Sequence, residues 1–409
     1  KPERKPLEGV KVVDFTWVLA GPFCSRLLAF FGAEMIKVEP RVDGDKVRRA
    51  LRNMFRDDAY GINLSGYFNN NNPNKMGITL DVNHPRGQEI VKKLVARADV
   101  VVENYSARVM RKWGLGYEDL RQVKPDIIMV SMSGMGHTGP YKDHVSFGPT
   151  LQAISGITYL MGYPDRGPVG FTYSYSDHVG GLNGALATLI ALEYRRRTGK
   201  GQHVDLAQLE ATCALLETAV LDYTVNGRGQ SMTGNRLPNF PAVPHGAYRC
   251  KGEDRWLVIG VFDEEEWQKL CQALGHPEWT RSEEFGTLLG RMANIDELDQ
   301  LVEQWTLEHD PHEAMRLLQE AGVPAGVVQT AEDLYHHDPQ LKERGFFLQL
   351  PHPELGPTMI ESVPIKLSST PGAFTRCSPL LGEHNDYVLR DILGLSEDEV
   401  NDLIIQSII

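Results

Sequence analysis

The sequence has 409 residues, of which 42% are hydrophobic and 23% charged, and its formal net charge is −12. This is the composition of a folded globular protein, and the length favours more than one lobe. The acidic balance argues against a nucleic acid as partner, and no apolar run approaches the roughly 20 residues that span a bilayer.

The five cysteines are dispersed along the chain and form no Cys-x-x-Cys pair. This pattern suggests neither a disulfide framework nor a zinc site. The thirteen histidines show no ligand spacing, so no metal site is predicted. The N-terminal stretch KPERKPLEG lacks the apolar segment of a secretory signal, which predicts a cytoplasmic protein.

The first third of the chain alternates between apolar runs typical of strands and amphipathic runs typical of helices. Strands are predicted at residues 10–15, 34–39, 76–82, 99–105 and 126–134. Apolar strands separated by helices are expected in a parallel sheet that is covered on both faces. The fold class is therefore α/β, with a large, doubly wound, Rossmann-like lobe.

The connection after the first strand reads TWVLAGP, which lacks the Gly-x-Gly-x-x-Gly fingerprint of dinucleotide sites. Glu39, at the end of the second strand, resembles the acid that binds a ribose in such folds, but one such residue is a weak signal. A nicotinamide cofactor is not expected. The Asn-rich connection between Arg49 and Lys75 is longer than a simple connecting loop in a compact lobe. It is predicted to cover a ligand or reach a partner subunit.

The stretch YSYSDHVGGLNG, residues 173–184, places one carboxylate, Asp177, just ahead of a helical pattern. The residues alone leave two interpretations open: Asp177 is a helix N-cap, or it is a nucleophile. The helix is predicted to end with three arginines, Arg195 to Arg197, before Gly199. Cations in a last turn complement the helix dipole, which is the favoured interpretation of those arginines.

A long helical stretch is predicted from about residue 207, followed by a polar segment rich in glycine and proline. A hairpin at 247–261 and helices from 264 to about 322 then predict a smaller α+β lobe. The predicted division is residues 1–224 for the large lobe, 225–328 for the small lobe, and 329–409 for a segment that returns to the large lobe.

Several segments together resemble the class III CoA-transferases, the family of formyl-CoA and crotonobetainyl-CoA transferases. The matching segments run in the family's order over nearly the whole chain: LEGVKVVDFTWVLAGPFCSRLLAFFGAEMIKVE, NKMGITLDV, DVVVENY, WGLGYEDL, GHTGPY, SDHVGGLNGALATLIALEYRRRTGKGQHVDL, GVPAGVV, HDPQL and PLLGEH.

The resemblance implies an interlocked homodimer, in which two ring-shaped chains pass through each other. It also implies that Asp177 is the nucleophile, which forms an anhydride with the acyl group and then a thioester with CoA. A carboxylate near a helix N-terminus is favoured in its ionised form, as this chemistry requires. Gly180 and Gly181 would allow backbone to approach the reacting carbonyl and offer N–H groups to the oxyanion.

For CoA, which is expected as a thioester substrate and not as a tightly bound cofactor, the resemblance points to five residues of the first lobe. They are Val18, Lys75, Asn104, Tyr105 and Lys112. The two lysines would supply local positive charge for the CoA phosphates, although a plain solvated surface lysine is the alternative for each. Asn104 and Tyr105 follow a buried strand, at the edge where ligands of such sheets bind.

The chain departs from the formate-specific members of the family at three places. Leu19 stands where those enzymes carry glutamine, Ser133 stands where they carry lysine, and LPNFPAVPHG (237–246) replaces their Gly-rich flap. A less polar pocket with Leu19, Tyr173 and Tyr175 predicts a larger acid than formate or oxalate. We expect an aliphatic or aryl-substituted dicarboxylate such as a substituted succinate, with a donor like succinyl-CoA.

Two other functions stay open at this stage. An α-methylacyl-CoA racemase would use the same aspartate as an acid/base partner of a nearby histidine, but Phe147 stands where that histidine is expected. A CoA-binding subunit of a heteromeric transferase would be expected to lack the nucleophile, whereas this chain keeps Asp177 and its glycines. The expected partners are therefore an acyl-CoA, a small carboxylic acid and a second chain, either identical or related.

Overall fold

The computed structural model describes residues 4–42, 44–49, 61–237 and 240–409. Residues 50–60 of the predicted long connection and residues 238–239 of the segment 237–246 lie outside the described residues. The chain divides into two compact units. The larger contains residues 1–158, 170–228 and 340–409, and the smaller contains residues 159–169 and 229–339, so that 159–169 belong to the smaller unit and not to the large lobe.

The larger unit is built on a six-stranded parallel sheet with the order β3-β2-β1-β4-β5-β8. Its strands are β1 (Lys11–Asp14), β2 (Glu34–Glu39), β3 (Lys75–Thr79), β4 (Val100–Glu103), β5 (Ile128–Ser133) and β8 (His203–Ala207). Because the chain winds outward from β1 on one side and from β4 on the other, a crevice is expected beyond the carboxyl ends of β1 and β4, where such sheets bind ligands. The predicted doubly wound α/β fold is confirmed.

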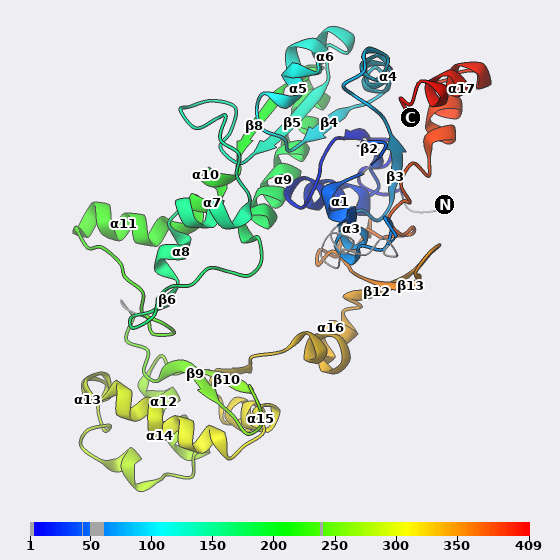
Figure 1. Cartoon of the computed structure of the whole chain (residues 1–409). Helices are drawn as coiled ribbons and strands as arrows, with labels where there is room; N and C mark the ends of the chain where they lie inside the picture. Colours follow the sequence, from blue (N-terminus) through cyan, green and yellow to red (C-terminus); the bar gives the residue numbers. More distant parts are fainter. Residues whose placement is uncertain (1–3, 43, 50–60, 238–239) are drawn as a thin grey trace. The chain divides into compact units, whose positions relative to one another are not determined.

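Helices cover both faces of this sheet (Figure 1). One face packs against α1 (Ala20–Phe30) and α9 (Tyr175–Thr198), and the other against α4 (Pro85–Val95), α5 (Val109–Lys112), α6 (Tyr117–Val123), the π-helical turn η5 (Tyr387–Ile392) and α17 (Glu397–Ile405). Each face has its own apolar cluster. The continuously apolar strands supply both clusters, as expected for strands buried on both sides.

The remaining elements of the larger unit are mostly short. They are η1 (Lys46–Arg49), α3 (Gly66–Asn71), α7 (Gly148–Ile154), α10 (Gln208–Cys213), η2 (Ala214–Leu216), α11 (Glu217–Asn226) and the hairpin β12 (Phe347–His352) and β13 (Gly356–Glu361). Two further helices, α8 (Ile157–Leu160) and α16 (Pro339–Glu343), contain the sequence boundaries between the units at 158/159 and 339/340. The helical stretch predicted from about residue 207 is confirmed over residues 208–226, where it consists of α10, η2 and α11 in succession, and residues 203–207 before it form β8.

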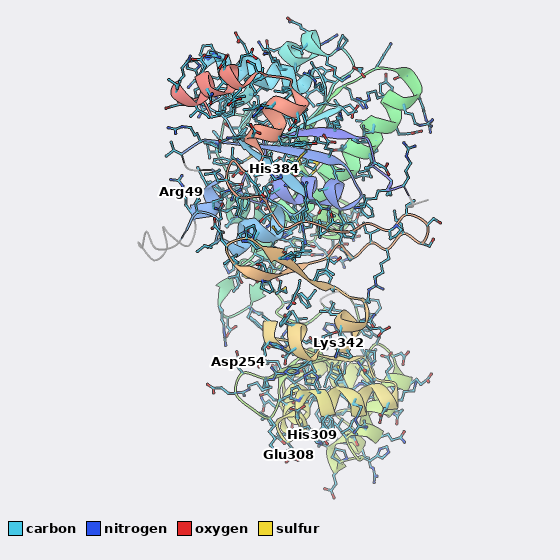
Figure 2. The ribbon with its side chains drawn as sticks, turned by 90° about the vertical axis from the view of Figure 1, so that its right-hand side faces the viewer. Arg49, Asp254, Glu308, His309, Lys342 and His384 are labelled. Carbon is cyan, nitrogen blue, oxygen red and sulfur yellow. The ribbon has the colours of Figure 1, made fainter. Side chains whose placement is uncertain are left out.

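The smaller unit contains a three-stranded antiparallel sheet with the order β11-β10-β9. Its elements are β9 (His245–Arg249), β10 (Trp256–Gly260), β11 (Ala325–Val327), α12 (Glu264–Ala273), η3 (Glu278–Arg281), α13 (Leu288–Ala293), α14 (Ile295–Leu307), α15 (Pro311–Ala321), η4 (Asp333–His337) and the short hairpin β6 (Gly162–Tyr163) and β7 (Gly167–Pro168). The predicted hairpin at 247–261 is confirmed as β9 and β10. Figure 2 shows side chains of this unit such as Asp254, Glu308 and His309.

None of the helices in the described part of the chain is both long and apolar enough to span a bilayer.

Candidate active site

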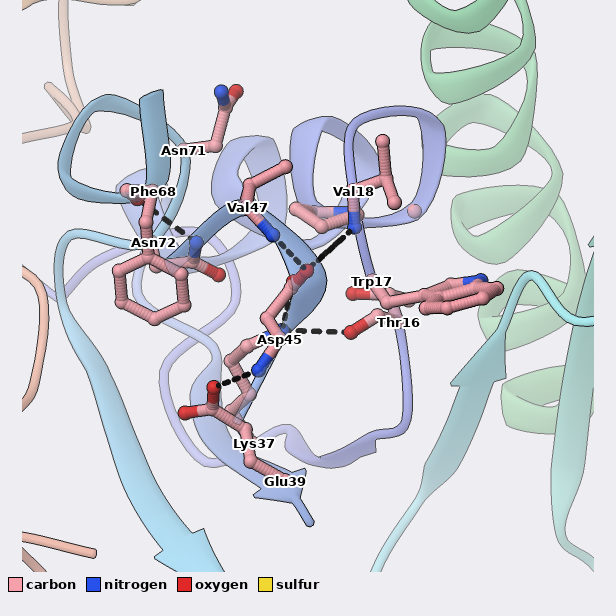
Figure 3. Close-up of polar contacts among 12 residues, drawn as sticks. Thr16, Trp17, Val18, Lys37, Glu39, Asp45, Val47, Phe68, Asn71 and Asn72 are labelled. Carbon is pink, nitrogen blue, oxygen red and sulfur yellow. Dashed lines mark hydrogen bonds and ion pairs between the residues drawn. The ribbon is translucent and has the colours of Figure 1, made fainter. Parts of the chain in front are cut away.

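The loop that follows β1, residues 16–18, lies at the carboxyl edge of the sheet and is held by side chains from three other segments. The amide and carbonyl of Trp17 pair with the Asn104 side chain at 2.9 and 3.0 Å. The amide of Val18 donates to the Asp45 carboxylate at 3.1 and 3.2 Å, and the carbonyl of Thr16 accepts from the Lys37 ammonium at 2.6 Å (Figure 3). Every residue of this loop is therefore fixed by at least one polar contact.

Val18 has φ of 63°. This left-handed backbone is disfavoured for a β-branched residue and costs about 1–3 kcal/mol. The contact from Val18 to Asp45 is part of what holds the backbone in that state. Such strain is often found where backbone approaches a ligand closely.

Beneath the loop lie three buried ion pairs, and all six side chains are at most 3% exposed. The pairs are Lys37–Asp45 at 3.3 Å, Arg48–Glu39 at 2.7 Å and Lys75–Asp14 at 3.1 Å. Three cations therefore balance three anions. Because Glu39 is bound by Arg48 through both carboxylate oxygens, at 2.7 and 2.9 Å, its carboxylate is not free to hold a ribose.

The pairs set the charge states of the buried groups. Burial raises the pKa of Asp14, but the Lys75 and Lys37 charges outweigh this and leave it below the usual value. Burial likewise opposes the charge of Lys37, yet its acidic neighbours, Asp45 foremost, raise its pKa. The opposite charges of this network thus offset part of the cost of burial, and the network contacts the loop after β1 through Lys37 and Asp45.

Lys75, a predicted CoA-binding residue, is one of these buried groups and is 1% exposed. Its ammonium contacts Asp14 and also donates to Ser25 at 2.6 Å and Asn72 at 2.8 Å. Burial lowers its pKa to about 8, against the raising effect of Asp14. The expectation of a solvent-facing lysine is corrected, because strand β3 begins at this residue and directs it into the interior.

Asn104 and Tyr105 follow β4 directly, as predicted, and lie beside the loop after β1. The ring of Tyr105 stands between two tryptophans, 5.5 Å from Trp17 and 5.4 Å from Trp113 between ring centroids. The ammonium of Lys46 lies over the ring of Trp17, 4.1 Å from its centroid. A row of aromatic rings with a cation at one end thus lies along the crevice between β1 and β4.

A cavity of about 290 Å³ opens at the same edge of the sheet. Residues that follow β1, β2, β3 and β4 line it, among them Phe15, Pro40, Arg41, Asn83, Tyr105 and Trp113. Its aromatic walls and the Arg41 guanidinium suit a flat heterocycle that carries phosphate. Lys112, the other predicted lysine, is exposed at the end of α5, next to Trp113.

Asp177 is the third residue of α9, and Ser174 is the N-cap. The interpretation of Asp177 as the N-cap is therefore wrong. The carboxylate is partly exposed and interacts with the Ser174 hydroxyl and the backbone amide of Ala20, the first residue of α1. Two helix N-termini, of α9 and of α1, therefore favour negative charge at this point.

Burial raises the pKa of Asp177 to about 6, although Ser174, His178 and Ala20 act in the opposite direction. At neutral pH the carboxylate is still mostly ionised. Tyr67, on α3, responds to the same charge: burial and then the Asp177 carboxylate raise the pKa of its phenol to about 12. Sequence reasoning missed Tyr67, which lies in the Asn-rich segment expected to cover a ligand.

Gly180 and Gly181 lie in the second turn of α9 and are buried. A Cβ on Gly180 would lie 2.8 Å from the Gln208 side chain, and one on Gly181 would lie 2.7 Å from the Ala20 carbonyl oxygen. Both glycines therefore allow α9 to approach α1 and α10 closely. Their N–H groups are past the first four helical residues, whose amides lack a partner within the helix.

The three residues expected around the acid lie in different environments. Leu19 is buried as the N-cap of α1, next to Ala20. Tyr173 is 78% exposed, and Tyr175 stacks on Phe171 with 5.2 Å between centroids. In the described part of the chain, no cluster of three or more His, Cys, Asp or Glu side chains is arranged to hold a metal ion.

The family model described as CoA-transferase family III matches residues 7–385. "Succinyl-CoA--D-citramalate CoA-transferase" from Chloroflexus aurantiacus is 38% identical, over 97% of this chain and 96% of that protein. "Succinyl-CoA--L-malate CoA-transferase beta subunit" from the same organism is 34% identical, over 97% and 96% of the two chains. The crystal structure of a CAIB/BAIF family protein from Brucella suis aligns with a TM-score of 0.86 at 32% identity, over 96% of this chain and 100% of that one.

Proposed function

The chain belongs to CoA-transferase family III, and on that premise we propose that it moves CoA from a succinyl-CoA-like donor to a substituted dicarboxylate through covalent intermediates on Asp177. The observation that carries this proposal is the placement of the Asp177 carboxylate. It is partly exposed, ionised at neutral pH, and set between two helix N-termini beside the fixed loop after β1.

In the first step the Asp177 carboxylate attacks the thioester carbonyl. A C–O bond forms, the C–S bond breaks, and CoA leaves as a thiolate. The thiolate then attacks the Asp177 carbonyl of the anhydride, which forms an aspartyl-CoA thioester and releases the donor carboxylate. The acceptor carboxylate repeats both steps in reverse, so no proton is consumed or released.

The geometry suggests which groups assist. The Ala20 amide is close enough to the Asp177 carboxyl to lower its pKa, and in this proposal that contact becomes a hydrogen bond to the oxygen when the attacked Asp177 carbonyl becomes an oxyanion. One such donor contributes about 3 kcal/mol in comparable acyl transfers. Gly180 and Gly181, predicted as oxyanion donors, serve in this proposal by letting α9 lie close enough to α1 for the contact to form.

For CoA we propose the crevice beyond β1 and β4. The nucleotide would occupy the 290 Å³ cavity beside Tyr105 and Trp113, and Arg41 and Lys112 would bind its phosphates. The strained backbone of Val18 and the Asn104 side chain then form the wall along which the pantetheine arm reaches Asp177. In this proposal Lys75 does not contact CoA, and its ion pair with Asp14 supports that wall.

The proposal also includes the identity of the acceptor acid. Two relatives are named for D-citramalate and L-malate, which are substituted four-carbon dicarboxylates, and this agrees with the pocket expected from the sequence. An assay with succinyl-CoA as donor and a panel of free acids tests it. We expect a substituted succinate to be the best acceptor, and oxalate as the best acceptor would refute this part.

A second chain is proposed to complete the assembly. α9 carries a row of exposed apolar side chains, which are Leu182, Leu186, Leu189 and Ile190, each 44–60% exposed. α11 carries another, with Val220, Leu221, Tyr223 and Val225 at 54–74%. Patches of this kind mark interaction surfaces, and we propose that a second copy of the chain covers them. Light scattering on the protein expressed alone separates a homodimer from a chain that needs a related partner.

The racemase alternative has weaker support. It needs an imidazole opposite Asp177, but the segment that contacts Asp177 presents Phe147 and Gly148. Exchange of the α-proton into deuterated water in the absence of a free acid would favour it.

A further inference from the structure

Gly148, the first residue of α7, lies directly against the Asp177 carboxylate. An ideal Cβ on Gly148 would stand 2.4 Å from Asp177 Oδ2, 2.5 Å from Ser174 Cβ and 2.6 Å from Ser174 Oγ. Real Cβ atoms essentially never approach other heavy atoms to less than 3.0 Å. The space that a side chain at residue 148 would fill is therefore already occupied by the carboxylate.

The surroundings of Gly148 leave little room for adjustment. The Ser176 hydroxyl, which is buried, donates to the Gly148 carbonyl at 3.1 Å. One turn further along α7, the buried Gln152 side chain donates to the Tyr173 carbonyl at 2.8 Å. These two contacts tie α7 to the start of α9 on both sides of Ser174, so α7 and Asp177 cannot separate without breaking both.

Asp177 has further contacts within α9 and with α1. The Asp177 amide donates to the Ser174 carbonyl at 3.1 Å, and the carboxylate interacts with the Ser174 hydroxyl and the Ala20 amide. Gly148 forms a wall against both the carboxylate and the Ser174 side chain. A methyl group on that wall would push the carboxylate away from its present position by about the 1 Å that separates a Cβ at 2.4 Å from ordinary contact.

We infer that Gly148 is a positioning residue for the nucleophile: its lack of a side chain sets the orientation from which Asp177 attacks the thioester. This inference rests on the proposed role of Asp177. A displacement of about 1 Å at a reacting group can cost about a hundredfold in rate, because the attack needs a defined distance and angle. Binding of CoA, which uses the other side of the loop after β1, is not expected to change.

Gly148→Ala tests the inference, with Gly170→Ala as the matched control. Gly170 is exposed, does not have a left-handed backbone, and a Cβ there would meet nothing within 4 Å. We expect Gly148→Ala to lower kcat about a hundredfold, to leave the KM for acyl-CoA within about threefold, and to move the acidic limb of kcat/KM above pH 6, because the carboxylate leaves the Ala20 amide. Gly170→Ala should match the parent protein in all three.

A second comparison separates misplacement of Asp177 from a general packing defect. Ser174→Gly removes two of the three atoms nearest to a Cβ at 148, and glycine is tolerated at an N-cap. In the Ser174→Gly background, Gly148→Ala should not change the thermal midpoint of unfolding but should still lower kcat. A kcat within twofold of Ser174→Gly alone, with an unmoved acidic limb, would overturn the inference.

The proposed function has its own readout in the same experiment. Capture of the acyl-enzyme with hydroxylamine should label Asp177 quickly in the parent protein and slowly in Gly148→Ala. Equal labelling rates refute the role of Gly148, whereas absence of label from the parent refutes the role of Asp177.

Discussion

The Lys75 ammonium lies 3.1 Å from the Asp14 carboxylate, and neither side chain is exposed to solvent. This buried pair lies under the loop that carries Trp17 and Val18, two residues at the edge of the proposed CoA crevice. The same ion pair therefore contributes to the stability of the sheet and supports the loop at the edge of the proposed site.

Removal of one partner of this pair should destabilise the protein. Lys75→Met removes the direct ion-pair partner of Asp14 and leaves the buried network with one more anion than cations, which costs about 3–5 kcal/mol in the free energy of unfolding. The double variant Asp14→Asn, Lys75→Met should recover part of that loss, because neither member of this pair is then charged and the other two pairs still balance each other. Urea-induced unfolding measures both. Unchanged stability of Lys75→Met together with a raised KM for acyl-CoA would instead indicate that Lys75 binds a phosphate directly.

The activity should depend on pH through Asp177. Because the pKa of this carboxyl is raised to about 6, the ionised form is lost as pH falls through 6. We expect kcat/KM to fall about tenfold per pH unit below this value. Monocarboxylic donors and acceptors should be used, because an ordinary carboxyl ionises at about pH 4. The charge of these substrates therefore stays constant over the pH range in which Asp177 is titrated. A flat profile from pH 7 to pH 5 would contradict the assignment.

Glu103, at the end of β4, should make stability depend on pH. Burial raises its pKa from 4.5 to about 7, even though Ser131 and the Tyr105 amide oppose the shift. The folded protein therefore binds a proton here between pH 4.5 and pH 7 that the unfolded chain does not, and this stabilisation is lost as pH rises through 7.

The variant Glu103→Gln checks this dependence, because glutamine stays neutral. Relative to the parent protein, its free energy of unfolding should improve by up to about 3 kcal/mol between pH 5 and pH 8.5. Urea-induced unfolding of both proteins at pH 5 and pH 8.5 gives the four free energies of unfolding that this comparison needs. An equal effect of the substitution at both values would show that Glu103 does not titrate in this range.

Arg41 and Lys112 should contribute to CoA binding and not to the chemical step. Loss of one charged hydrogen bond to a phosphate costs about 1.5 kcal/mol, so Arg41→Ala and Lys112→Ala should each raise the KM for acyl-CoA about tenfold with kcat unchanged. Lys142→Ala, which removes another exposed lysine of the larger unit, is the control. If all three variants behave alike, the phosphates bind elsewhere.

Much of the fold could be predicted because the strands of the central sheet are apolar on both faces. The stretch EMIKVE was expected at 34–39 and forms β2 over the same residues. β8 was missed because its sequence, HVDLA, is half polar, and it lies at the edge of the sheet with only partial burial. An edge strand buries less apolar surface, so its sequence carries a weaker signal.

The candidate site was predicted less completely, because its contacts join distant parts of the chain. Asn104 and Tyr105 could be placed at the sheet edge, since any residue that follows a parallel strand lies there. The burial of Lys75 could not be predicted, because its partner Asp14 is 61 residues away and meets it only once β1, β2 and β3 pair. Gly148 gave no signal, since nothing in its own segment indicates that a carboxylate from α9 will lie against it.

The central claim is that Asp177 becomes covalently acylated during CoA transfer. Incubation with a panel of acyl-CoAs, followed by hydroxylamine or borohydride and mass analysis of the peptide that carries Asp177, tests it most directly. We predict a label on Asp177 in the parent protein, with no label and no CoA exchange in Asp177→Asn. An Asp177→Asn variant that exchanges the thioester at the parent rate, or a label on another residue, would contradict the claim.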